Sequence, residues 1–440
     1  MPTDPSQLDH DHLWHPFTQQ RDWCGEEPLV IESAEGSHLI ATDGRRYLDG
    51  TSSLWCNVHG HRHPGIDSAV RAQLDKVAHS TMLGLAHPGA AELAARLIAI
   101  APDDLNRVFY SESGSTATEI ALKMAFQFQQ QRGGQHARRT SFVHLREAYH
   151  GDTIGSVSVG GIDLFHSTYR PLLFKTHAAE PGDAADMERV LRAHEEEVAA
   201  VIVEPMVQGA AGMLIHPPGY LRAVRELCDR FGVLLICDEV ATGFGRTGTM
   251  FACEAERVAP DLLCLAKGLT GGYLPLAATL ATERVYEGFL GAPAQQRTFF
   301  HGHTYTGNPL ACAAALASLD AFESERTIER LRPKISLLEE LLAEVEAMAE
   351  VTEVRSRGFM VGIDLGDHDA ELRLGHRVTL EARERGAIVR PLGNTIVLVP
   401  PLAISEADLR RLVEITAESI VAACASLSAP SALDRLPRAA

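Results

Sequence analysis

Short apolar segments alternate with longer amphipathic segments between about residue 100 and residue 310, and this alternation limits the possible folds. The apolar segments are rich in β-branched residues or leucine and end at glycine, proline or a polar residue: 107–110, 141–145, 199–204, 233–238 and 262–266. Between them, 116–131 and 220–231 carry apolar residues at steps of three and four, as amphipathic helices do. Strands that alternate with helices predict βαβ units and a mainly parallel sheet, which is an α/β fold.

Both ends of the chain differ from this middle part. Residues 29–48 carry Asp43-Gly44 between two apolar pairs, which predicts a small antiparallel hairpin. After residue 325 we expect a smaller α+β unit, with a helix at 327–348, strands at 359–365 and 396–398, and a final helix after Ser405. The predicted division is 1–60 for an N-terminal arm and part of the small domain, 61–325 for the large domain, 326–425 for the C-terminal small domain and 426–440 for a flexible tail.

Composition and charge exclude several classes of protein. With 45% hydrophobic and 22% charged residues, the 440-residue chain has the composition of a soluble globular protein. Its 40 basic and 58 acidic residues give a formal charge of −18 and no basic run, so we expect no nucleic-acid or membrane partner. The N-terminus lacks a signal-peptide layout, and the eight cysteines contain no Cys-x-x-Cys pair. We therefore expect free thiols and a cytoplasmic protein.

An acid and a lysine stand at the ends of two predicted strands. Asp238 closes the strand at 233–238, and Lys267 follows the strand at 262–266. Ligands bind beyond the carboxyl ends of the strands in an open α/β sheet, so we expect both side chains in one crevice. A lysine there can form a Schiff base with an aldehyde, and a carboxylate can keep a pyridinium nitrogen protonated. An ordinary ion pair at the sheet edge explains the same two residues.

A candidate phosphate site lies where a predicted strand runs into Ser113-Gly114-Ser115 at the start of a long helix. The free N–H groups and the positive end of a helix bind phosphate. The alternative is that Ser113 or Ser115 only caps the helix.

Other polar residues fit a substrate pocket less specifically. Tyr149 can stack on a flat heterocycle, Thr304 can add a phosphate contact, and Arg390 suits a substrate carboxylate unless it is only a surface arginine in a turn. The histidines of the segment 59–63 suggest a metal, but an arginine and a proline interrupt them and they form no helical i, i+4 pair. We expect no metal site.

Four ordered segments resemble the class III aminotransferases, which are pyridoxal-phosphate enzymes of fold type I. They are 203–209 (VEPMVQG), 237–248 (CDEVATGFGRTG), 260–272 (PDLLCLAKGLTGG) and 306–313 (TGNPLACA). Within this class, 15–19 (HPFTQ), 52–61 (SSLWCNVHGH) and 148–153 (AYHGDT) resemble the members that aminate 8-amino-7-oxononanoate in biotin synthesis. The resemblance spans nearly the whole chain.

The resemblance implies pyridoxal 5'-phosphate as cofactor and a homodimer with shared active sites. Catalytic roles fall on Lys267 as the Schiff-base lysine, Asp238 as the partner of the ring nitrogen and Tyr149 as the stacking aromatic. The implied cofactor-binding residues are Gly114, Ser115, Tyr149, Glu204, Asp238, Val240 and Lys267, with His303 and Thr304 from the neighbouring subunit. The implied substrate-binding residues are Phe17, Leu54, Trp55, Tyr149, Asp152, Arg246, Lys267, Gly302 and Arg390.

The amino donor implied by the resemblance is S-adenosylmethionine or L-lysine. Phe17, Leu54 and His303 stand where the S-adenosylmethionine-using members usually have tyrosine, tryptophan and proline, and a lysine-using branch looks similar at these points. Two other interpretations remain: another class III enzyme that acts on ω-amino acids or diamines, and a non-catalytic regulator on the same fold. A regulator would carry a DNA-binding module, and no basic segment of that size precedes residue 60.

Overall fold

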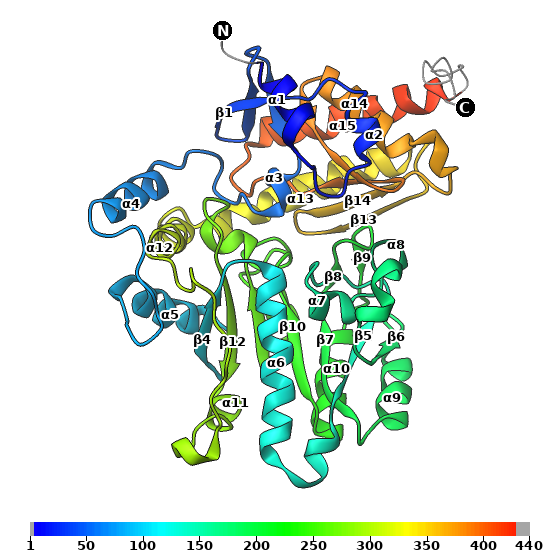
Figure 1. Ribbon diagram of the computed structural model, residues 1–440. Helices are drawn as coiled ribbons and strands as arrows, with labels where there is room; N and C mark the ends of the chain where they lie inside the picture. The colour runs from blue at the N-terminus through cyan, green and yellow to red at the C-terminus, as the bar shows by residue number, and fades with distance from the viewer. Residues whose placement is uncertain (1–3, 428–440) are drawn as a thin grey trace.

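The computed structural model describes residues 4–427 and contains strands from both the middle and the ends of the chain (Figure 1). The strands are β1 (Ile31–Glu35), β2 (His38–Ala41), β3 (Arg46–Asp49), β4 (Leu105–Ser111), β5 (Ser141–Leu145), β6 (Thr176–Ala179), β7 (Val198–Val203), β8 (Val207–Gln208), β9 (Leu214–Ile215), β10 (Leu234–Asp238), β11 (Leu262–Leu265), β12 (Ala277–Thr282), β13 (Glu353–Arg357), β14 (Met360–Asp364), β15 (Ala387–Ile388), β16 (Arg390–Leu392) and β17 (Thr395–Leu398).

The helices lie around these strands and between them in the chain. They are α1 (Pro5–His12), α2 (Gln20–Trp23), α3 (Ser52–Trp55), α4 (Pro64–Leu74), α5 (Pro88–Ile100), α6 (Gly114–Arg132), α7 (Ile154–Ser158), α8 (Asp163–His166), α9 (Ala184–Ala193), α10 (Tyr220–Phe231), α11 (Glu283–Glu287), α12 (Pro309–Ser324), α13 (Thr327–Glu346), α14 (Leu374–Glu384) and α15 (Glu406–Ser426). A short 3₁₀ turn, η4 (Lys267–Thr270), begins one residue after the end of β11.

The central sheet has the order β4-β12-β11-β10-β7-β5-β6. It confirms the predicted α/β fold, and all five predicted strands lie within two residues of their expected bounds. β12 is antiparallel to both of its neighbours, so the sheet is mixed at this point. The sequence pattern does not predict β12 or β6. β12 (AATLAT) and β6 (THAA) are built largely from alanine and threonine and lack the branched apolar run of their neighbours.

The longest helix of the central part, α6, packs across the sheet and is visible as the long cyan helix in Figure 1. Ser113 accepts a hydrogen bond from Thr116 N, and the Thr116 side chain accepts from Ser113 N, so a capping box fixes where α6 begins. Gly133, with φ of +69°, follows its last residue. α10 has the predicted bounds and ends at Gly232 in the left-handed conformation.

The two ends of the chain meet above the central sheet, at the top of Figure 1. β2 and β3 form the predicted antiparallel hairpin, and β3 pairs in parallel with β15 from the far end of the chain. The predicted helix at 327–348 and the final helix after Ser405 correspond to α13 and α15. The exact division into domains stays a prediction, and most of the predicted tail at 426–440 lies outside the described residues.

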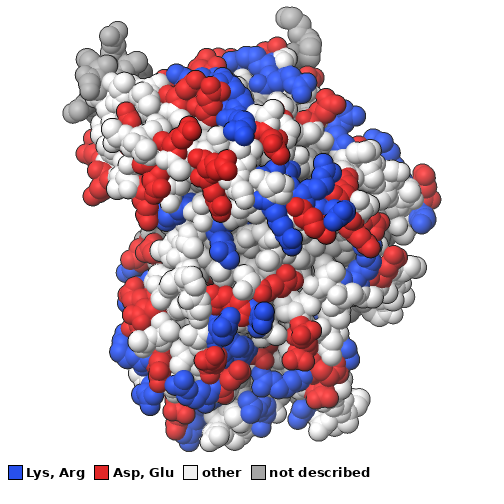
Figure 2. All heavy atoms as spheres, turned by 180° about the vertical axis from the view of Figure 1, so that it is seen from behind, with Lys and Arg blue, Asp and Glu red and all other residues white. Residues whose placement is uncertain are grey.

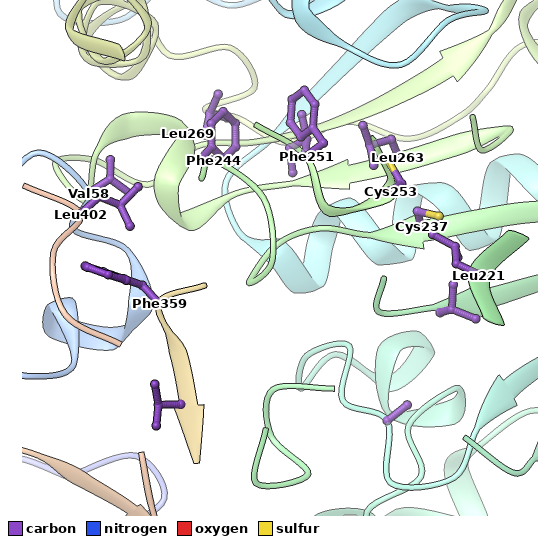
Figure 3. Packing of buried hydrophobic residues seen from close by; sticks show 14 of the residues in the cluster. Val58, Leu221, Cys237, Phe244, Phe251, Cys253, Leu263, Leu269, Phe359 and Leu402 are labelled. Carbon is purple, nitrogen blue, oxygen red and sulfur yellow. The ribbon is translucent and has the colours of Figure 1, made fainter. Parts of the chain in front are cut away.

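One continuous hydrophobic cluster joins the chain ends to the central sheet (Figure 3). Val58, Phe359 and Leu402 from the ends belong to the same cluster as Phe244 and Leu263 from the central part. Each is at most 1% exposed, and full burial of such a side chain contributes roughly 1.5–3 kcal/mol. The shared core therefore fixes the position of the end segments relative to the carboxyl ends of the central strands.

The surface charge and the cysteines can be compared with the expectations of no basic run and of free thiols. Basic and acidic side chains are intermingled on the face shown in Figure 2. All eight cysteines lie within the described residues as free thiols, and five of them are buried. No helix in residues 4–427 is both long enough and apolar enough to span a bilayer.

Candidate active site

A cavity of about 730 Å³ opens at the carboxyl ends of β5, β7, β10 and β11, and we call it the inner chamber. Ten of the predicted site residues line it: Leu54, Trp55, Gly114, Ser115, Tyr149, Asp152, Glu204, Asp238, Val240 and Lys267. Residues that the sequence analysis did not assign also line it, among them His150, Glu112, Thr270 and Tyr273. The chamber therefore lies where an open α/β sheet binds its ligands.

Lys267 is the second residue after β11 and has a left-handed backbone with φ of +43°. Its Nζ forms no hydrogen bond or ion pair with any residue of the described chain, so the ion pair that the sequence left open is absent there. The Nζ lies 4.8 Å from the centroid of the Trp55 ring. Burial lowers the pKa of the Lys267 amine, which favours the neutral, nucleophilic form.

Asp238 is held in a fixed orientation at the end of β10, where it is 4% exposed. Its Oδ1 accepts a hydrogen bond of 3.0 Å from Val240 N, and its Oδ2 lies 2.7 Å from Nδ1 of the fully buried His150. His150 lies in the segment 148–153 that carries the family resemblance, but the sequence pattern predicts no role for it. Its place shortly after β5, at the same sheet edge as Asp238, was the available signal.

Glu204 follows β7 and is buried at the base of the inner chamber. Its two carboxyl oxygens accept hydrogen bonds of 3.1 Å from Tyr149 N and 3.0 Å from Gly209 N. Burial raises the Glu204 pKa to about 7, although both N–H groups act in the opposite direction. Glu204 thus attaches the backbone of Tyr149 to the end of β7. Trp55 packs against Gly209, because a Cβ added at Gly209 would lie 2.9 Å from the Trp55 ring.

The start of α6 forms one wall of the inner chamber. Ser113 is the N-cap, as one of the two sequence interpretations expected. The N–H groups of Gly114 and Ser115 have no acceptor within residues 4–427, and both residues line the chamber. An added Cβ at Gly114 would lie 2.5 Å from Val240 Cγ1, so only glycine fits there. The free N–H groups and the positive end of a long helix together suit a phosphate.

The residues that line the inner chamber include a suitable partner for each part of pyridoxal phosphate. Lys267 offers an amine for the aldehyde, and Asp238 offers a buried carboxylate for the ring nitrogen. The N–H groups of Gly114 and Ser115 suit the phosphate, and Tyr149 lines the same chamber as an aromatic side chain.

A second cavity of about 310 Å³ adjoins the first, and we call it the outer chamber. Phe17, Phe165 and Arg390 line it, and Ala210 borders both chambers. The Phe17 and Phe165 rings meet edge to face, with centroids 5.4 Å apart. Arg390 belongs to β16 rather than to a turn, so the surface-turn interpretation is wrong.

The guanidinium of Arg390 is a free cation in this part of the structure. It forms no hydrogen bond or ion pair with the described residues, and burial lowers its pKa without removing its charge at neutral pH. A partly buried, unpaired arginine favours an anionic ligand, and its planar donors match a carboxylate.

Four predicted site residues line neither chamber. Arg246 is 1% exposed and donates to Pro400 O at 2.6 Å and Asn57 O at 2.8 Å, so its guanidinium joins backbone segments. His303 bonds to Glu112 of the same chain, while Gly302 and Thr304 are exposed. The roles given to these four residues stay predictions.

The histidines of the segment 59–63 each bond to a different protein group. His59 lies 3.0 Å from Ser318 Oγ, His61 lies 2.8 Å from Asp49 Oδ2, and His63 lies 2.7 Å from Glu325 Oε1.

Elsewhere in the described chain, three residues that could each offer a metal ligand have these atoms within 4.8 Å of one another: His177, His194 and Glu197. The two imidazoles are stacked with centroids 3.6 Å apart and planes 16° apart. Because an imidazole binds a metal in its ring plane, two nearly parallel rings cannot both direct a nitrogen at one ion. We assign no metal role to either set of histidines.

Residues 21–420 match the family model described as aminotransferase class-III. The chain is 60% identical over 439 residues to the adenosylmethionine-8-amino-7-oxononanoate aminotransferase of Nitratidesulfovibrio vulgaris, covering 94% of this chain and 81% of that one. It is 50% identical to the protein of the same name from Geobacter sulfurreducens, covering 94% and 96%.

Solved structures of aminotransferases are also similar to this chain. The crystal structure of adenosylmethionine-8-amino-7-oxononanoate aminotransferase from Methanocaldococcus jannaschii matches with a TM-score of 0.93 and 45% identity, covering 95% of this chain and 98% of that one. A PLP-bound amine transaminase from an uncultivated Pseudomonas species matches with a TM-score of 0.87 and 37% identity, covering 94% and 99%.

Proposed function

The chain belongs to the class III aminotransferase family, and on this premise we propose that it converts 8-amino-7-oxononanoate to 7,8-diaminononanoate, the aminotransfer step of biotin synthesis. The observation that carries this proposal is the unpaired Arg390 in an outer chamber that joins the Lys267 chamber at Ala210. An oxo acid with a long aliphatic chain separates its carboxylate from its ketone, and the two adjoining chambers offer one partner for each end. The names of the relatives support the same substrate.

Pyridoxal 5'-phosphate supplies the electron sink and carries the amino group between the two substrates. Lys267 and Asp238 would hold its aldehyde and its ring nitrogen, and the N–H groups of Gly114 and Ser115 would hold its phosphate. His150 keeps the Asp238 carboxylate oriented and stabilises its charge through a buried contact. Tyr149 would cover the ring, fixed from behind by the bond from its N–H to Glu204.

Lys267 provides the acid and base for the reaction. In its neutral form, Nζ takes a proton from the carbon that bears the donor's amine, and in the second half of the cycle it returns a proton to the former ketone carbon. The lowered pKa of this amine favours the base at neutral pH. Because one site serves both half-reactions, donor and acceptor bind in turn, which gives ping-pong kinetics.

The acceptor would extend from the inner to the outer chamber. Its carboxylate would bind Arg390, and its chain would contact Phe17, Trp55 and Tyr149, which line the two cavities. Tyr149 also donates to Asp152 Oδ2 at 2.8 Å, so its hydroxyl is held in place.

The amino donor is S-adenosylmethionine or L-lysine. The relatives' names support the first donor. Phe17 and Leu54, which are 58% and 49% exposed, support the second, because Phe17 has no phenol hydroxyl and Leu54 has no indole to contact an adenosyl group. Turnover with one donor and none with the other decides between them.

We also propose a cytoplasmic homodimer with shared sites, in which His303 and Thr304 reach the partner's cofactor phosphate. Two large apolar side chains are strongly exposed in the single chain. Phe300, three residues before His303, is 81% exposed, and Leu83, in another loop, is 90% exposed. Such residues favour a protein interface. Free, mostly buried thiols support a reducing compartment.

Purified holoenzyme tests the proposal when it is given 8-amino-7-oxononanoate and each donor, with the diamine product followed by mass spectrometry. Formation of 7,8-diaminononanoate supports it. The second candidate is an ω-amino acid or diamine aminotransferase, which the similarity to the amine transaminase favours. Activity with β-alanine or putrescine and pyruvate, and none with the oxo acid, would replace the proposal by this candidate.

A further inference from the structure

The loop that carries Leu54 and Trp55 into the inner chamber has an unusual backbone. Ser52, Ser53 and Trp55 have φ values of 50°, 61° and 63°, in the left-handed region that non-glycine residues rarely adopt. Three such residues within four positions cost free energy and persist only where the surroundings hold them. The loop therefore needs external bonds to keep its form.

Asp49, at the end of β3, supplies most of these bonds. Its side chain is completely buried, and its oxygens accept from Thr51 N at 3.2 Å and from Ser53 N at 2.8 Å. Ser52 Oγ adds a bond of 2.6 Å to Val399 O, which attaches the loop to the segment after β17. The carboxylate thus orients two N–H groups of the strained segment.

His61 in turn holds Asp49. Its Nε2 lies 2.8 Å from Asp49 Oδ2, and its side chain is 14% exposed. The backbone of His61 is itself fixed, because its N–H and C=O both pair with Gly36, between β1 and β2. The imidazole therefore acts on the carboxylate from a rigid position.

The contacts from His61 through Asp49 and the loop lead to Lys267, the proposed reacting lysine. Trp55 is 8% exposed, its ring lies 4.8 Å from Lys267 Nζ, and it packs against Gly209 on the other side. A shift of the loop would move this ring relative to Lys267 and change the wall that meets the substrate. Because this ring forms part of the wall that meets the substrate, we expect such a shift to weaken substrate binding more than it slows the chemical step.

We propose that His61 is a positioning residue: through Asp49 it holds residues 50–56 in the strained form that sets Trp55 against Lys267. His61 touches neither chamber, so it acts only through the loop. The inference rests on the proposed function only for its kinetic readout, because the geometry around Trp55 is measured without any substrate.

The kinetic test compares His61→Leu, which removes the bond to Asp49, with His61→Gln, whose Nε2 can reach the same oxygen. We expect His61→Leu to raise KM for the oxo acid about tenfold while kcat changes much less, and His61→Gln to restore most of the loss. The matched control is His63→Gln, since His63 also bonds to a carboxylate, Glu325, but has no contact with the loop.

The spectroscopic test follows Trp55 directly in the holoenzyme. Only three tryptophans occur in the chain, so Trp14→Phe with Trp23→Phe leaves Trp55 as the sole indole. In this background we expect His61→Leu to increase acrylamide quenching of Trp55 by about twofold or more and to reduce energy transfer to the bound cofactor, while the His63→Gln control leaves both unchanged.

Unchanged Trp55 quenching in His61→Leu would overturn the inference, whatever the activity. Equal losses in His61→Leu, His61→Gln and His63→Gln would also overturn it, because they would show a general loss of stability. If the wild-type enzyme fails to turn over the oxo acid, the proposed function fails, and the Trp55 measurement still decides the role of His61.

Discussion

The inner and outer chambers are built in different ways. Asp238, Glu204 and Lys267 in the inner chamber directly end or follow neighbouring strands of one sheet, and the two carboxylates are each 4% exposed. The outer chamber is assembled from segments far apart in the chain, and Phe17 in its wall is 58% exposed. The buried sheet edge fixes Asp238, Glu204 and Lys267, whereas the outer chamber has a more open wall that is built from distant segments.

The difference predicts that changes to the proposed reacting groups, Lys267 and Asp238, act mainly on kcat, whereas changes to the walls that contact the substrate act mainly on KM. Lys267→Ala is the strongest test. We expect kcat to fall by more than about 1,000-fold, because the variant loses its acid and base. Turnover by rapid-quench assay measures this, and circular dichroism checks that the fold is intact. Full turnover in this variant would remove the catalytic assignment.

Asp238→Asn removes the charge opposite the ring nitrogen but keeps the shape of the inner chamber. We expect kcat to fall on the order of 100-fold, since a preorganised charge contributes most in a buried site. The absorbance of the bound cofactor shows whether it is still present. A rise in KM alone, with kcat unchanged, would contradict the role of Asp238.

Arg390→Ala tests the outer chamber. Hydrogen bonds to a charged group contribute about 1.5–3 kcal/mol, so we expect KM for the oxo acid to rise roughly 10- to 100-fold with a small change in kcat. Arg411→Ala on the exposed face of α15 is the control. An unchanged KM for the oxo acid in Arg390→Ala, or an equal rise in Arg411→Ala, would contradict the assignment.

Leu54→Trp sharpens the comparison at the edge of the inner chamber. A new aromatic surface contributes about 0.5–1.5 kcal/mol, so KM for S-adenosylmethionine should fall by roughly two- to tenfold if the adenosyl group meets this wall. KM for the oxo acid serves as the internal reference. No change in KM for S-adenosylmethionine would mean that Leu54 does not select the donor.

Glu204→Gln tests burial in the inner chamber through stability rather than activity. Glu204 keeps its proton up to a pKa of about 7 in the folded protein, whereas in the unfolded chain it releases the proton near the ordinary glutamate pKa of 4.5. The free energy of unfolding therefore falls as pH rises between these values. Denaturant titrations from pH 4.5 to 7 measure this dependence. In Glu204→Gln, the decrease of the unfolding free energy with pH should be less steep, by the equivalent of about one proton.

The sequence was most informative where local pattern and site coincide. Strand β10 ends at Asp238 and β11 ends just before Lys267 in the structure, as the apolar segments predicted. The pattern did not identify β12, because a strand of small residues between two long neighbours lacks a branched apolar run. It also gave His150 no role, because the bond to Asp238 spans 88 positions in the chain.

Local periodicity and motifs within short segments thus determined the fold class, the family and the place of the lysine and the carboxylate at the ends of neighbouring strands. Only the tertiary structure decided that Arg246 bonds to backbone carbonyls, that Arg390 is an unpaired cation beside Phe17, and that His61 holds Asp49. The physical reason is the shared core. It brings the two chain ends over the sheet edge, and no local pattern specifies which side chains then meet.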